Sequence, residues 1–193
     1  MVLNHRIIIL VCIFSSLLVI LVSNQNIQGI FHSESSEEFT TYENPLYGIN
    51  IKYPTDWRYY EKNGPETFSP DRIFQVSFLS PSNKVLSDMV FVWFNIEKIK
   101  DSVSLDDRKN ILLKNLNNSS IDVKVQSTKL SGIDAFMIDY TNKAIELQRN
   151  IGIEAIRDGL LYSLDFTARP DTFEKNLDSI ETMIKSMNIS SFT

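Results

Sequence analysis

The amino-acid sequence predicts an α+β fold in which helices flank an antiparallel β-sheet on both faces, an α/β/α sandwich. Three observations lead to this fold class. Several short segments alternate apolar and polar residues, as strands with one buried face do. The segment Met89–Phe94 is apolar at every position, which is expected of a strand covered on both faces. Segments 105–116 and 173–187 repeat apolar residues at helical spacing.

The first half of the domain is rich in strand patterns. Residues 49–53 alternate and stop at Pro54, which cannot donate to a central ladder. Residues 74–78 alternate in the same way, and the doubly apolar segment 89–94 follows them. Three strands are therefore expected before the first helix.

That helix is expected at residues 105–116. Ser104 can cap it together with Asp107 three residues later. Leu105, Leu112 and Leu116 form an apolar stripe, so the helix is expected to shield one face of the sheet.

Two hairpins are expected after the helix. Residues 123–140 form the first, around a turn at Ser131-Gly132, and residues 151–166 form the second, around Asp158-Gly159. An Asp-Gly pair between two alternating runs is a strong hairpin signal, because both turn residues adopt a positive φ.

A second helix is expected at the C-terminal end of the domain. It follows Pro170 and begins with a capping box of Asp171 and Glu174. Its apolar residues keep helical spacing and are expected to pack on the sheet: Phe173, Leu177, Ile180, Ile184 and Met187.

The composition is ordinary for one globular domain. The chain has 193 residues, of which 43% are hydrophobic and 22% charged, and its formal net charge is −5. It has no basic run suited to a phosphate backbone, so no nucleic-acid partner is expected. Cys12, His5 and His32 are its only cysteine and histidines. Cys/His zinc sites, Ser-His-Asp triads and Cys-His dyads are therefore excluded from residue 33 onward.

Residues 7–22 are apolar except for Ser15 and Ser16. A segment of this length lies between a secretory h-region and a bilayer span, so residues 1–23 are either a signal peptide or an N-terminal membrane anchor. No A-x-A-like cleavage site follows. We therefore favour the anchor, with secretion after cleavage as the alternative.

The flanking charges predict the orientation of this segment. Arg6 precedes it, and the next charged residue is Glu34. The positive-inside rule then puts the N-terminus in the cytoplasm and the rest of the chain outside it. Residues 24–38 are polar and without periodicity, which indicates a linker, and residues 39–193 are expected to form a single domain.

Two stretches of the domain resemble the PsbP-like family. Tyr42–Trp57 is similar to the opening pattern of the family: an aromatic residue, a Tyr-Gly turn, an alternating strand and Pro-x-x-Trp. Phe166–Phe173 and Met183–Ile189 look like the closing strand and the final helix of the family. The family includes the extrinsic oxygen-evolving subunit of photosystem II, its non-photosynthetic prokaryotic relatives and a Ran-binding nuclear-import factor.

The resemblance covers about residues 39–190 and implies a sheet with helices on both faces. It also implies a non-enzymatic module, here membrane-anchored and extracytoplasmic, that binds or helps to assemble a membrane protein complex. It does not imply photosynthesis, because plastid transit features are missing. The alternative is an exported protein that binds a small apolar molecule or calcium. The expected partners are the membrane, through residues 7–22, and a protein of the membrane or envelope.

Carboxylates are the candidates for chemistry in the domain. Glu154 and Asp165 on the second hairpin form a potential acid–base pair, although positions on a strand surface explain them equally well. Asp101, Asp106 and Asp107 gather at the start of the first helix, where carboxylates favour the positive helix end. No nucleophile, cofactor loop or calcium-loop spacing is present. We therefore expect no enzyme activity, no metal site and no cofactor.

Aromatic residues crowd the first strands of the domain. Tyr47, Tyr53, Trp57 and Tyr59 are candidates for a binding surface, and core packing is the alternative explanation.

Three N-x-S sequons begin at Asn117, Asn118 and Asn188. If the domain is exported, these asparagines are potential N-glycosylation sites.

Overall fold

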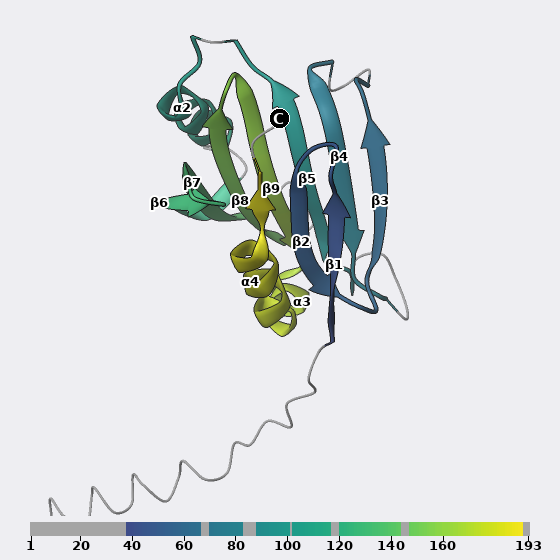
Figure 1. The fold of residues 1–193 in the computed structure, drawn as a ribbon. Helices are drawn as coiled ribbons and strands as arrows, with labels where there is room; N and C mark the ends of the chain where they lie inside the picture. Colours follow the sequence, from purple (N-terminus) through teal and green to yellow (C-terminus); the bar gives the residue numbers. More distant parts are fainter. Residues whose placement is uncertain are drawn as a thin grey trace, which may run out of the picture. The chain divides into compact units, whose positions relative to one another are not determined.

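The alternating segments form two antiparallel sheets in the computed structural model of the protein (Figure 1). The structure describes residues 38–66, 70–82, 88–100, 102–116, 120–143 and 147–190, which belong to one compact unit. The large sheet has the strand order β3-β4-β5-β9-β8-β7-β6. Its strands are β3 (Arg58–Asn63), β4 (Arg72–Leu79), β5 (Phe91–Lys98), β6 (Ser120–Leu130), β7 (Ile133–Asn142), β8 (Gln148–Arg157) and β9 (Leu160–Ala168).

The small sheet has the order β1-β2-β10, formed by Phe39–Asn44, Ile49–Pro54 and Asn188–Ile189. It brings the two ends of the domain together, because β10 pairs with β2. The Ser190 amide also donates to the carbonyl of Gly48 at 2.7 Å. Gly48 has φ +61°, and an added Cβ would approach Ser190 to 3.1 Å, so this turn favours glycine.

The helix-flanked α/β/α sandwich expected from the sequence is wrong. The described part of the chain is mostly strand, with three helices: α2 (Leu105–Leu116), α3 (Pro170–Lys175) and α4 (Leu177–Ser186). Residues 49–53 were expected as a strand of a single sheet, but they lie in β2 of the small sheet instead. Periodicity identifies which side of a strand is buried, but it does not identify the layer that buries it.

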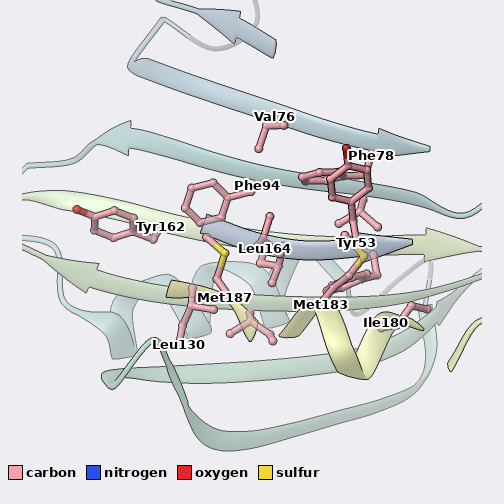
Figure 2. Packing of buried hydrophobic residues seen from close by; sticks show 14 of the residues in the cluster. Tyr53, Val76, Phe78, Phe94, Leu130, Tyr162, Leu164, Ile180, Met183 and Met187 are labelled. Carbon is pink, nitrogen blue, oxygen red and sulfur yellow. The ribbon is translucent and has the colours of Figure 1, made fainter. Parts of the chain in front are cut away.

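One face of the large sheet forms the core (Figure 2), and we call it the core face. Phe94 and Leu164 lie on it and are fully buried. Ile180 and Met183 of α4 pack there, while Tyr53 of β2 lies with its ring centroid 5.0 Å from that of Phe78. The small sheet and α4 therefore cover the core face together.

Both expected hairpins are present. Arg157 pairs with Leu160 across the turn between β8 and β9, and Asp158 and Gly159 have φ values of 55° and 73°. These positive values are those of a type I′ turn, which explains the Asp-Gly pair. Ser131 and Gly132, in the turn between β6 and β7, also have positive φ values.

Helix α2 has the expected bounds and cap. The Ser104 amide and hydroxyl donate to Asp107 Oδ2 at 2.9 and 2.6 Å, and the Asp107 amide donates to Ser104 Oγ at 3.1 Å. The two hydrogen bonds that Ser104 donates to the Asp107 carboxylate hold the pKa of Asp107 below its usual range. None of the residues of α2 is fully buried, however, so its leucine stripe shields the sheet only in part.

The C-terminal helix is two helices rather than one. The backbone leaves helical geometry at Asn176, between α3 and α4. The expected capping box does not form, because Pro170 occupies the first helical turn and Arg169 is the N-cap residue. Glu174 instead pairs with Arg149 of β8.

Candidate functional site

The side of the large sheet opposite the core carries polar side chains. Alternate residues of a strand point to opposite faces, so the neighbours of the buried core residues share this side. We call it the polar face. Its members are Gln75, Trp93, Asn95, Glu97, Asn150, Glu154, Ser163, Asp165 and Thr167.

A cavity of about 410 Å³ lies between the polar face and α2. Leu112 and Leu116 of the helix form one wall, and the polar face together with Tyr140 of β7 forms the other. The helix rests over the sheet without filling the space beneath it, because its residues are at most half-buried. The volume lies within the range of about 300–1,000 Å³ that is typical of small-molecule sites.

A bidentate ion pair joins α2 to the polar face. Arg108 donates Nε to Glu154 Oε2 at 3.0 Å and Nη2 to Glu154 Oε1 at 2.8 Å. Glu154 is 6% exposed, and its hydrogen bonds raise the pKa of Arg108 despite the partial burial of the guanidinium. Both carboxylate oxygens of Glu154 are thus committed to the helix, and its role is to position α2.

Asp165 lies beside this pair and points at the backbone of Gly152. A Cβ added at Gly152 would stand 2.9 Å from Asp165 Oδ1, so glycine makes room for the carboxyl group. Asp165 is mostly buried by protein atoms, and only a small part of its surface is accessible at the cavity wall. Burial, followed by repulsion from Glu154 and Glu97, raises its pKa to about 7, and a hydrogen bond with Ser163 opposes the rise.

Amide, hydroxyl and aromatic groups complete the cavity wall. Asn95 donates to Ser163 Oγ at 3.2 Å, and Thr167 donates to Asn150 Oδ1 at 2.5 Å. Trp93 stacks on Phe91 with 5.8 Å between ring centroids. The wall therefore offers hydrogen-bonding groups and an aromatic surface together.

Arg72 also lines the cavity. It is buried and forms an ion pair with Glu66 at 2.9 Å, outside the cavity wall. It also donates to Gln75 Oε1 at 3.1 Å. Like Arg108, it already has a carboxylate partner.

The four aromatic residues proposed as a binding surface have different surroundings. Tyr53 and Trp57 are buried in the core, and Tyr47 is half-buried and stacks on Phe74 at 4.4 Å. Tyr59 is 47% exposed and lies against Tyr42, with 5.1 Å between ring centroids. Only Tyr59 of the four offers a large accessible surface, and binding by this set stays a prediction.

The remaining sequence-predicted positions lie apart from the cavity wall or outside the described residues. Asn188 is exposed on β10 and accepts a hydrogen bond from Ser131, whereas Asn117 and Asn118 lie outside the described residues, as does Asp101. Asp106 is exposed and pairs with Lys109, and the cap engages Asp107. The described residues contain no group of three or more His, Cys, Asp or Glu side chains placed to hold a metal ion.

A family model described as PsbP-like protein matches residues 1–189. The chain belongs to the PsbP-like family. Cyanobacterial PsbP from Synechocystis sp. PCC 6803 is similar in structure, with a TM-score of 0.57 and 12% identity over 84% of this chain and 99% of that one. LpqN, involved in cell envelope biogenesis of Mycobacterium tuberculosis, has a TM-score of 0.56 and 14% identity over 80% of this chain and 91% of its own. A search of curated proteins finds no match.

Membership in the PsbP-like family indicates an accessory domain, because PsbP-like proteins are in general non-enzymatic. The solved structures share the fold at low sequence identity, and their likeness concerns the fold alone. Within the part of the chain that the structure describes, no helix is long and apolar enough to cross a membrane. The apolar segment 7–22 lies outside that part.

Sequence reasoning named Glu154 and Asp165 but missed the cavity around them. Asn95 and Glu97 continue the alternation of β5 with polar residues, which is the signal that this strand has a polar face. Gly152 in the middle of β8 is a second signal, because an interior glycine often marks a close approach by another group. The cavity itself depends on α2, whose position the sequence does not specify.

Proposed function

We propose that this chain is a non-enzymatic accessory domain, held at the extracytoplasmic face of a membrane by residues 7–22, that binds or helps to assemble a membrane protein complex. The observation that carries the proposal is the match to the PsbP-like family over residues 1–189. Arg6 before the apolar segment supports the orientation. The similar protein LpqN is involved in cell envelope biogenesis, which supports an envelope location for this chain.

Strand β3 is the best candidate for the partner-binding surface. It is an edge of the large sheet, and all six of its residues are exposed. Tyr59 and Tyr60 are 47% and 55% exposed, and tyrosine is enriched among residues that dominate binding energy at protein interfaces. An unpaired edge also offers backbone groups to an added strand.

The other edge of the large sheet is less suited to this role. Strand β6 has a register shift between Ile121 and Lys124, and Asp122 within it has φ 56°. Irregularities of this kind protect an edge from pairing with another strand. The pairing of β3 with β4 is regular along its whole length.

Photo-crosslinking in the native membrane tests the proposal. A crosslinkable residue in place of Tyr60 should capture one defined membrane protein, and the same residue in place of the exposed Lys175 of α3 should not. Equal capture from both positions, or none from Tyr60, contradicts a partner surface on β3.

Protease treatment of spheroplasts tests the orientation separately. The domain should be digested in intact spheroplasts, while a cytoplasmic marker protein remains protected. Protection of the domain until lysis contradicts the extracytoplasmic location.

A further inference from the structure

We propose that the cavity beneath α2 binds a small organic cation, an amine or guanidinium compound of the diamine class. The proposal concerns a different face of the domain from β3 and does not depend on the partner-binding function. It is carried by the size of the cavity, by the charges on its wall and by the aromatic ring that borders it.

The charges on the cavity wall favour a cation. Arg108 is committed to Glu154, and Arg72 is committed to Glu66. Glu97 and Asp165 have no ion-pair partner in the described part of the chain. The wall thus presents two carboxyl groups that form no direct ion pair in the described part of the chain and share the field of Arg108 with its partner Glu154, so a bound ammonium or guanidinium group would supply the missing charge.

The size and lining favour an organic cation over a bare ion. A volume of about 410 Å³ far exceeds the space that one hydrated metal ion needs, and the described residues contain no ligand cluster for a metal. Trp93 borders the same space, and an indole ring attracts organic cations by cation–π interaction. Leu112 and Leu116 of α2 supply apolar contacts for a methylene chain between two charged ends.

The arrangement of Gly152 and Asp165 supports a built site. Glycine opposite Asp165 keeps the space that the carboxyl group occupies, and any larger residue would push the carboxyl aside. Asp165 also faces Glu154 on β8, Glu97 on β5, Tyr140 on β7 and Arg108 on α2. Burial, followed by repulsion from Glu154 and Glu97, raises its pKa to about 7 although Arg108 opposes the rise, so the carboxyl group at the cavity wall ionises only with difficulty.

A bound cation would lower the raised pKa of Asp165. The ionised form of Asp165 would become favourable beside a positive charge, so binding should release a proton near neutral pH. The affinity should therefore rise as the pH increases through about 7 in the wild type. The corresponding profile of Asp165→Asn should be flat over the same interval.

Isothermal titration calorimetry on the full chain in detergent provides the test. Putrescine and agmatine are the charged probes, and 1,4-butanediol is the uncharged probe of matched length. At pH 8, the charged probes should give saturable binding and the diol none. Asp165→Asn and Trp93→Leu should each weaken binding by at least about tenfold. Asp178→Asn, an exposed carboxylate on α4, should leave it within about twofold of wild type.

Each other result contradicts the proposal. Absence of saturable binding by both amines, equal binding by the diol, or equal loss in Asp165→Asn and Asp178→Asn overturns the cation site. Binding of calcium or magnesium chloride without binding of the amines also overturns it, in favour of an inorganic ion. Thermal unfolding of each variant shows whether it is folded, and Glu97→Gln provides a second neutral substitution on the cavity wall.

Discussion

On β5, Val92, Phe94 and Ile96 point to one side of the large sheet and are fully buried. Trp93 and Asn95 alternate with them and point to the other side, where they remain partly exposed. The same strand thus contributes to a dense apolar core and to the wall of a polar cavity. The difference arises from what covers each face.

The core face is covered by apolar side chains of the small sheet and α4, whereas the polar face is covered in part by α2 through one ion pair. Close-packed apolar contacts stabilise the fold but leave no room for a ligand. A loosely covered polar face contributes less to stability and keeps groups available for binding. Proteins commonly accept this local loss of stability at functional sites.

The largest expected effect comes from the core face. Phe94→Ala should lower the free energy of unfolding by about 3–5 kcal/mol, because a fully buried ring leaves a cavity in the core. Asn95→Ala, one residue along, should cost about 1 kcal/mol, since it removes the hydrogen bond to Ser163. Urea midpoints of both variants give the comparison. Similar losses in the two variants would show that both faces stabilise the fold equally.

Local sequence signals predicted most of the elements on both faces. The Asp158-Gly159 turn and the Ser104 cap form as expected, because both depend on residues within a few positions of one another. The alternation of β4 correctly identified Phe74, Val76 and Phe78 as buried. The break at Asn176 was missed, since apolar spacing continues across it.

The layers and the cavity depend on contacts between distant residues, and the sequence did not predict them. Arg108 and Glu154 are 46 positions apart, so no local pattern reveals that the carboxylate is buried and paired. β2 likewise pairs with β10 near the end of the domain, which periodicity cannot anticipate. The sequence therefore predicted the residue types on each face but not what covers them.

The next largest effect concerns the ion pair between α2 and the polar face. Arg108→Met should cost about 2–3 kcal/mol, because it leaves the buried Glu154 without a cation and close to Asp165. Lys109→Met, which removes an exposed pair with Asp106, should cost less than about 0.5 kcal/mol. Adding Glu154→Gln to Arg108→Met should restore part of the loss. Chemical denaturation of the three variants decides whether the pair anchors the helix, and equal costs at Arg108 and Lys109 would argue against it.

An effect of opposite sign, which depends on pH, is expected at Asp165. Its pKa is about 7 in the folded protein and near 4 in an unfolded chain, so the folded form holds a proton that the unfolded form has lost between these values. The stability that this group contributes is complete below about pH 4 and is lost as the pH rises through about 7. Asp165→Asn should thus be more stable than wild type at pH 8, by up to about 4 kcal/mol for a difference of three pKa units, and nearly equal to it at pH 4.

Denaturant midpoints between pH 4 and pH 9 check this difference. Asp178→Asn serves as the control, because that carboxylate is exposed on α4. A constant difference between Asp165→Asn and wild type across this range would mean that Asp165 does not ionise with difficulty in the fold.

The smallest expected effect concerns the cap of α2, and it sharpens the contrast between the two faces. Ser104→Ala removes a hydroxyl that accepts a hydrogen bond from the Asp107 amide and donates one to the Asp107 carboxylate. Loss of such a cap costs about 1 kcal/mol. Because α2 has no fully buried residue, we expect this loss to favour local opening of the helix more than global unfolding.

Amide hydrogen exchange should accelerate about fivefold in α2, at Leu112 for instance, while Phe94 and Leu164 on the core face keep their wild-type rates. Ser102→Ala, in the exposed turn before the cap, is the matched control and should change neither set. Equal acceleration on α2 and on the core strands would mean that the helix opens only when the whole domain unfolds, and that the polar face is as firmly covered as the core.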